Sequence, residues 1–172
     1  MNRLIHSGTG LHIKVKDITA SRKFYEDLLD LVPVFGYGDA EFRSTLPAAI
    51  PSVMNDGFPG APERYRGVTY EPAPQCPIEI AEGHIGVPNQ AVFREPITSP
   101  KVSAMMRVAS LLPLVREKGL RPVFPIRHYY WGTIEIAIKD PDGFVLVIIA
   151  PFSEGELEEL RKLVDVEEVL AG

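Results

Sequence analysis

The sequence is poor in features that several classes of protein require. One cysteine, Cys76, in 172 residues excludes an internal disulfide and a thiolate metal cluster. The net charge of −5 lacks the basic excess that nucleic-acid binding selects. The longest apolar run, 144–152, is too short to cross a bilayer, and the N-terminal residues lack a signal-peptide core. We therefore expect a cytoplasmic protein without nucleic-acid or membrane partners, in which Cys76 is an inert core residue.

A β-hairpin is predicted between Tyr129 and Pro151. Three isoleucines alternate with polar or small residues over 133–139, as in a strand that is buried on one face. In the Asp-Pro-Asp-Gly sequence that follows, proline fixes φ at the start of a turn and glycine permits a positive φ at its end. The second strand, 144–149, is apolar on both faces, which indicates a central place in a sheet.

The same order of elements is predicted twice. A strand, a helix and three further strands fit 11–82 and again 102–150, with a proline-containing linker at 83–101. An amphipathic C-terminal helix is predicted at 153–170. In the irregular segment 37–64, one or two helical turns are predicted at 40–50, and the prolines and glycines that follow break any longer element. The segment is either a functional loop or a surface insertion. The length suits a single domain, 1–172, made of two related modules.

In the first module, a strand is predicted at 11–15 and a helix at about 20–29, capped by Asp17 or Thr19. We expect the helix to face the core with Phe24 and Leu28, and Leu31 to continue that stripe beyond its end.

Three stretches carry a likeness to a known family. They are LHIKVKDITASRKFYEDLLDL at 11–31, PIEIAEGHIGVP at 77–88, and a Trp-Gly pair that begins nine residues before Asp-Pro-Asp-Gly. In this order and spacing the chain resembles the vicinal oxygen chelate superfamily, which includes glyoxalases, bleomycin resistance proteins and extradiol dioxygenases. The resemblance implies an α+β fold in which two βαβββ modules form a curled mixed sheet around a cavity. A C-terminal helix is added here, and a homodimer is the implied assembly.

The resemblance also says where a metal ion would bind. The ligand positions of metal-binding members correspond here to Gly10, Glu79, Ser103 and Val147. One carboxylate among these four residues does not make a divalent-ion site, so we expect no cofactor and no metal of the family type. If a metal ion does bind, Glu79 and His12 are the residues that we expect to hold it.

The sheet face opposite the helices is the cavity face that the resemblance implies. We expect a small-molecule ligand to contact the side chains of this face: His12, Glu79, Ser103, Met105, Arg107, Trp131, Thr133 and Glu135.

Of these residues, His12 and Glu135 are the candidate catalytic groups, because a histidine and a carboxylate in a cavity are what proton abstraction needs. His12 is equally a structural residue or a hydrogen-bonding partner of a ligand. Glu135 is equally a member of a buried ion pair with Arg107. Trp131, beside Tyr129 and Tyr130, either stacks on a flat ligand or closes the end of the barrel. Lys14 and Lys139 stand at strand ends, where solvent exposure is expected.

Three functions follow from this pattern. The chain binds or sequesters a small hydrophobic or aromatic metabolite without the family metal, or performs metal-independent acid–base chemistry on it. Alternatively, it is a metal-dependent lyase, isomerase or dioxygenase that uses Glu79 and His12. The third alternative is a degenerate domain that serves dimer assembly. The sequence leaves open whether the protein is an enzyme.

Overall fold

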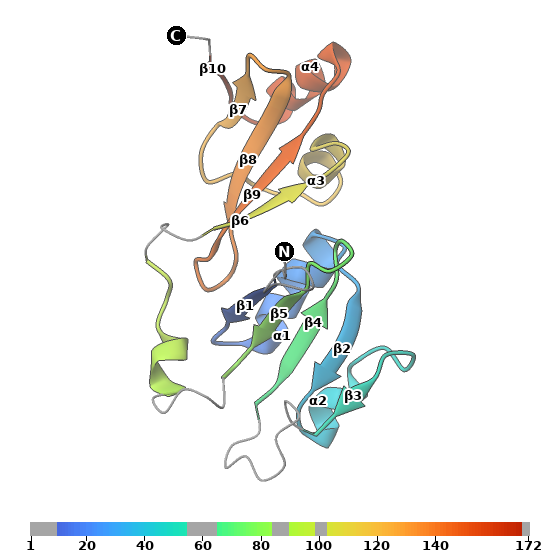
Figure 1. The fold of residues 1–172 in the computed structure, drawn as a ribbon. Coiled ribbons are helices and arrows are strands. Elements are labelled where there is room, and N and C mark those ends of the chain that lie inside the picture. The colour runs from blue at the N-terminus through green and yellow to red at the C-terminus, as the bar shows by residue number, and fades with distance from the viewer. Residues whose placement is uncertain (1–9, 55–64, 84–89, 99–102, 170–172) are drawn as a thin grey trace, which may run out of the picture. The chain divides into compact units, whose positions relative to one another are not determined.

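The computed structural model describes residues 10–54, 65–83, 90–98 and 103–169 (Figure 1). The chain divides into two compact units, Met1–Pro96 and Ile97–Gly172. Each unit has its own five-stranded mixed sheet, with helices on one face. The predicted α+β fold with two βαβββ modules is therefore confirmed, while a combined sheet that curls around a cavity stays a prediction. Among the described residues, no helix is long and apolar enough to span a membrane.

The first unit contains a mixed sheet with the strand order β1-β5-β4-β2-β3. β1 runs parallel to β5, β5–β4 and β4–β2 are antiparallel, and β3 is added parallel to β2. Its elements are β1 (Leu11–Lys14), α1 (Ile18–Arg22), the π-helix η1 (Lys23–Leu28), β2 (Pro33–Tyr37), α2 (Ala40–Ser44), β3 (Ser52–Val53), β4 (Gly67–Tyr70), β5 (Ile78–Ala81) and the 3-10 helix η2 (Gln90–Arg94).

The helix that follows β1 has the predicted cap, but it begins at Ile18 and not at 20, and its turns widen from Lys23 onward. Asp17 caps it, since its carboxylate accepts hydrogen bonds from the backbone N–H groups of Thr19 and Ala20. From Lys23 onward the helix is a π-helix, whose wider turns shift the buried stripe relative to α-helical spacing. Tyr25 is therefore the fully buried side chain of this segment, and the predicted Phe24 and Leu28 are only half-buried.

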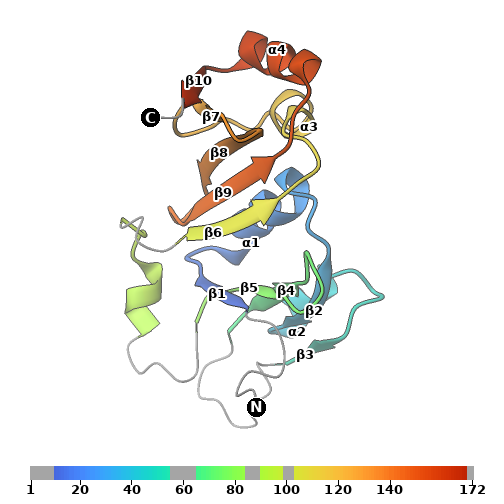
Figure 2. The same ribbon diagram turned by 45° about the horizontal axis from the view of Figure 1, so that its top comes forward.

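The second unit contains a mixed sheet with the order β10-β7-β8-β9-β6 (Figures 1 and 2). The predicted hairpin is confirmed as β8–β9, and its turn is held by Asp140, which accepts hydrogen bonds from the N–H groups of Asp142 and Phe144. Gly143 has φ +92, as the turn requires. The elements are β6 (Ser103–Arg107), α3 (Leu112–Arg116), β7 (Ile126–Tyr129), β8 (Thr133–Lys139), β9 (Val145–Ala150), α4 (Glu154–Leu163) and β10 (Val166–Val169).

Both sheets bury one face and leave the other partly open. In β8 and β9, residues alternate strictly between buried and half-buried or exposed. The buried face of this hairpin meets α3 and α4, whose starts are joined by a hydrogen bond from Ser110 Oγ to Glu156 Oε1. The buried side chains of this core are Leu111, Val115, Ile134, Ile136, Ile138, Leu146, Ile148, Leu157 and Leu160.

The predicted extent of the C-terminal helix and the predicted burial of Cys76 are wrong. The C-terminal helix ends at Leu163 and not near 170, because the chain turns into β10, which pairs in parallel with β7. The helical turn predicted within 40–50 is confirmed as α2, while β3 and η2 are short elements that were not predicted within 37–64 and 83–101. Residues 55–64, 84–89 and 99–102 lie outside the described part of the chain. Cys76 is exposed in the β4–β5 connection and is not a core residue.

The two sheets share one topology, including the direction of every neighbouring pair. In each unit the first strand ends with the same backbone hydrogen bond to the last strand of the module. The donor–acceptor distance is 2.9 Å from Val15 N to Ala81 O and 3.0 Å from Val108 N to Ile149 O. Aligning the registers at this bond gives equivalent positions on the open faces: Lys14 and Arg107, His12 and Met105, Glu79 and Val147, Thr69 and Ala137, Gly67 and Glu135, Tyr37 and Arg127.

Candidate functional site

On the open face of the first unit, three donors gather around one oxygen atom of Glu79. Tyr37 Oη donates to Glu79 Oε1 at 3.1 Å, and Lys14 Nζ pairs with the same atom at 3.4 Å. His12 Nδ1 lies 3.7 Å from it. The side chains of Lys14 and Glu79 are only 13% and 19% exposed, whereas that of His12 is 59% exposed. The carboxylate is thus fixed by an ion pair and a hydroxyl, with an imidazole at the solvent side.

The other oxygen atom of Glu79 is left available. Among the described residues, no donor engages Oε2 in a hydrogen bond or ion pair, and it is not among the buried polar atoms that lack a partner. Because the contacts of Oε1 hold the carboxylate in place, Oε2 has a fixed direction, but it accepts no hydrogen bond from a described residue. A carboxylate held in this way presents one preorganised acceptor to a hydroxyl or N–H group of another molecule.

Tyr37 reaches Glu79 because of a bulge in β2. The register of β2 with β4 shifts between Pro33, which is opposite Tyr70, and Phe35, which is opposite Thr69. This extra residue moves Tyr37 from the helix-covered face to the open face, since one residue of shift reverses every later side chain. The ring then lies against Gly67, where a Cβ atom would be 2.3 Å from Cζ of Tyr37. Gly67 therefore provides the space that the tyrosine ring occupies.

The open face of the second unit has a different character. Met105, Val147 and Ala137 lie side by side on β6, β9 and β8 and form an apolar row across the sheet. The Met105 side chain is 60% exposed. The next row places Arg107 opposite Ile149, Ile149 opposite Glu135, and Glu135 opposite Arg127. Arg127 forms an ion pair with Glu167 of β10. Arg107 has no hydrogen bond or ion pair with any residue in the described ranges, so the predicted pair with Glu135 does not form.

Aromatic residues meet at the turn between β7 and β8. The rings of Tyr129 and Trp131 stack with centroids 4.2 Å apart, and Trp131 Nε1 donates to Thr133 Oγ1 at 2.7 Å. Tyr129 Oη donates to Glu135 Oε1 at 3.5 Å, and burial together with this carboxylate raises the pKa of Tyr129. Trp131 and Tyr130 are more than half exposed, so they do not form part of a packed core within the described structure.

The structure brings some of the predicted site residues together and leaves others apart. His12 and Glu79 are neighbours across β1 and β5, and Trp131 contacts Thr133. Ser103, Met105 and Arg107 lie on the open face of β6, in a row along the strand. Lys14 was expected to be exposed and instead is largely buried against Glu79, while Lys139 is exposed as predicted.

The sequence reasoning missed Tyr37 and Gly67. A bulge reverses which face Tyr37 occupies, and no pattern in the 33–37 segment reveals a bulge. The glycine at the start of β4 was the available signal, because a glycine within a strand often marks a close approach by another group.

The residues at the family's metal positions do not fit a metal site. Gly10 has no side chain, and a Cβ there would lie 2.9 Å from Pro77 O. Val147 offers only hydrocarbon, and one oxygen of Glu79 is already engaged by Lys14 and Tyr37. A divalent ion needs several nitrogen or oxygen ligands. Within the described residues, no group of three or more His, Cys, Asp and Glu side chains is placed to hold a metal ion.

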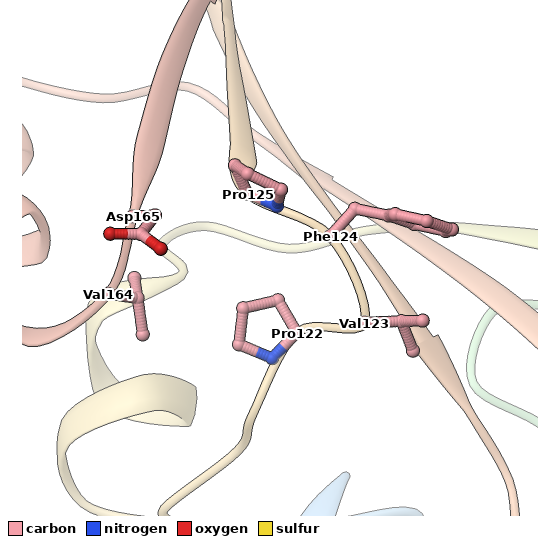
Figure 3. A pocket seen from close by; sticks show the side chains of 6 residues that line it. All are labelled: Pro122, Val123, Phe124, Pro125, Val164 and Asp165. Carbon is pink, nitrogen blue, oxygen red and sulfur yellow. The ribbon is translucent and has the colours of Figure 1, made fainter.

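An open hollow of about 260 Å³ lies in the second unit (Figure 3). It is formed by the chain before β7 and the connection between α4 and β10, and none of the predicted site residues lines it. Its walls are Pro122, Val123, Phe124, Pro125, Val164 and Asp165.

The chain has the fold of the glyoxalase/bleomycin resistance protein/dioxygenase superfamily. A solved member of that superfamily from Sphaerobacter thermophilus matches 86% of this chain and 99% of its own, with 18% identity and a TM-score of 0.53. UcmS2 matches 85% of this chain and 98% of its own, with 16% identity and a TM-score of 0.56. The fosfomycin resistance protein FosX of Listeria monocytogenes, solved with manganese(II) and sulfate, matches 90% and 99%, with 13% identity and a TM-score of 0.50.

At these identities the likeness shows the fold alone. No protein-family model and no curated protein matches the sequence.

Proposed function

We propose that this protein binds a small, partly apolar organic molecule on its open sheet faces, without the divalent ion of the metal-binding members of its fold. The observation that carries the proposal is the state of Glu79. One oxygen is occupied by Lys14 and Tyr37, while the other is fixed and available. Such a carboxylate suits acceptance of a ligand's hydroxyl or N–H group better than service as one of several metal ligands.

The remaining predicted contacts support the same proposal. His12 is exposed beside Glu79 and is a second hydrogen-bonding group for the ligand. Ser103, Met105 and Arg107 on β6, together with Trp131, Thr133 and Glu135 on the β7–β8 side, provide apolar and aromatic surface with a few charges. This composition is typical of small-molecule sites. Binding or sequestration is the function that this geometry favours, and a homodimer in the cytoplasm is the setting we propose for it.

The test is a titration of 2-naphthol, an aromatic probe with one hydroxyl donor, followed by ligand-observed NMR on protein treated with a chelator. We expect binding without added metal. Glu79→Gln and His12→Ala should each weaken binding on the face of the first unit by roughly fivefold or more, because each removes a polar contact. Glu135→Ala tests the face of the second unit in the same way. Glu158→Ala, on the exposed side of α4, is the matched control and should bind like wild type.

Two results would count against the proposal. Binding that appears only after manganese, zinc, nickel or iron is added would favour the metal-dependent alternative, with Glu79 and His12 as ligands. Absence of binding with and without metal would favour a domain whose role is dimer assembly.

A further inference from the structure

Each unit has a cationic side chain at the same position of its first strand, but only in the first unit does a neighbouring carboxylate pair with it. Lys14 and Arg107 occupy the same position on their sheets, one residue before the hydrogen bond that ends each first strand. In the first unit the neighbouring row supplies Glu79, which neutralises Lys14. In the second unit Val147 stands at the position of Glu79, so Arg107 faces hydrocarbon where Lys14 faces a carboxylate.

Among the described residues around Arg107, none replaces this carboxylate. Glu135 is two strands away across Ile149, and its Oε1 accepts from Tyr129. Arg127 lies opposite Glu135 in the register and forms its ion pair with Glu167 of β10. Across residues 10–54, 65–83, 90–98 and 103–169, no carboxylate forms an ion pair with Arg107.

Beside this guanidinium lies apolar surface. Met105 is 60% exposed, and the half-buried Val147 and Ala137 extend the same row across β9 and β8. Exposed apolar surface next to a single unpaired cation has a defined chemical complement: a molecule with an apolar body and one anionic group. A guanidinium binds carboxylate and phosphate groups alike, because both offer two oxygen atoms to its planar fork.

We propose that Arg107 binds the anionic group of a small organic acid whose apolar part covers Met105 and Val147. The proposal rests on the proposed function and names the class of its ligand: an apolar carboxylate, phosphate or phosphonate. The anion takes the place that Glu79 takes beside Lys14 in the first unit.

The decisive comparison uses 2-naphthoate and 2-naphthamide, which share one shape and differ in charge. Both are titrated into the full chain at low salt, and binding is followed by NMR. We expect naphthoate to bind on the order of tenfold more tightly than the amide, because a charge-assisted contact with Arg107 is available only to the carboxylate. Raising the salt concentration should reduce this preference.

Variants connect the preference to Arg107. Arg107→Gln should abolish the preference for the carboxylate and leave amide binding within about twofold of wild type. Arg116→Gln makes the same change of net charge on α3 and should keep the preference, because Arg116 pairs with Glu117 and does not belong to the sheet. Val147→Glu restores the carboxylate that the first unit has. It should therefore pair with Arg107 and remove the preference as well.

Carboxylates and phosphates are separated by repeating the titration with 2-naphthyl phosphate, whose affinity relative to naphthoate ranks the two anions. Equal binding of naphthoate and naphthamide would overturn the ligand class while leaving the proposed function standing. No binding of either probe would overturn both. A change of oligomeric state in Arg107→Gln, seen by analytical ultracentrifugation without a change in probe preference, would assign this face to a second copy of the chain and overturn the inference.

Discussion

The two units have the same strand order and directions, yet their open faces use opposite chemistry. The first unit places a carboxylate in one row and surrounds it with Lys14, Tyr37 and His12. The second unit places Val147 at the equivalent position and exposes Met105, and no carboxylate among the described residues pairs with Arg107. On the helix-covered side, the buried side chains of both units are mainly apolar. The topology therefore depends on the buried face, and the open face is free to diverge between two modules of one chain.

The largest change in the free energy of unfolding should come from a substitution at Gly67, whose equivalent in the second unit is Glu135. Gly67→Ala places a methyl group against the Tyr37 ring and should lower the free energy of unfolding by about 2 kcal/mol, as overpacking does. Glu135→Ala should change it by less than about 0.5 kcal/mol, because only a long contact with Tyr129 is lost. Urea denaturation measures both variants.

A double variant separates this steric effect from a general intolerance of side chains at Gly67. Combined with Tyr37→Leu, the Gly67→Ala change should cost much less, because the shorter side chain does not reach the added methyl group. An equal cost in both backgrounds would contradict the role assigned to the Tyr37 ring. Gly155→Ala in α4, where nothing lies within 4 Å of the added atom, is a control that should be neutral or slightly stabilising.

A smaller change in the free energy of unfolding should distinguish the two equivalent cations, Lys14 and Arg107. Lys14→Gln leaves Glu79 in a largely enclosed place without its counterion and should cost about 1–2 kcal/mol of unfolding free energy. Arg107→Gln should cost less than about 0.5 kcal/mol, because the exposed guanidinium has no ion pair among the described residues. Equal costs in chemical denaturation would mean that the faces are more alike than their contacts indicate.

The smallest effect at neutral pH concerns two tyrosines and appears fully only in alkali. Burial, and then Glu26, raise the pKa of Tyr70, which donates to that carboxylate at 3.0 Å. The unfolded chain releases this proton at a lower pH than the folded chain. Stability is therefore fully present below the unfolded pKa, near 10, and falls as the pH rises above it, by up to about 1.4 kcal/mol per pH unit.

Tyr70→Phe should cost about 1 kcal/mol at pH 8 and flatten this alkaline loss. Tyr129→Phe should flatten it less, because Tyr129 is only half-buried. Unfolding measured between pH 8 and 11 compares them, and an unchanged slope in Tyr70→Phe would contradict the assignment.

Much of the fold could be predicted because the buried face repeats with a period of two. The alternation of Ile134, Ile136 and Ile138 and the turn at 140–143 predict β8 and β9 correctly. The element order of both modules follows from the same kind of pattern. The C-terminal strand could not be predicted in this way, because Val166-Glu-Glu-Val continues the charge pattern of the helix before it and gains its strand partner only from β7.

The candidate site could be predicted only in part, since its geometry depends on side-chain reach and on one irregularity. Parity alone places His12 and Glu79 on the same face, as the structure shows. It does not reveal that Lys14 folds inward, or that a bulge turns Tyr37 onto this face. Nor does it reveal that Val147 takes the position of Glu79, so that no carboxylate of the described residues pairs with Arg107.

The fifth strands, β3 and β10, have a consequence for solubility. Each is added outside the four strands of its module, one from within the module and one after it. An edge strand with unpaired backbone groups can recruit a strand from another chain and start aggregation. β3 spans only two residues, and β10 carries Glu167 and Glu168 in ion pairs with Arg127 and Arg161. The edge strand β3 is protected from pairing with another chain by its short length, and the edge strand β10 by its charged side chains. Two different sequences thus resist unwanted self-association.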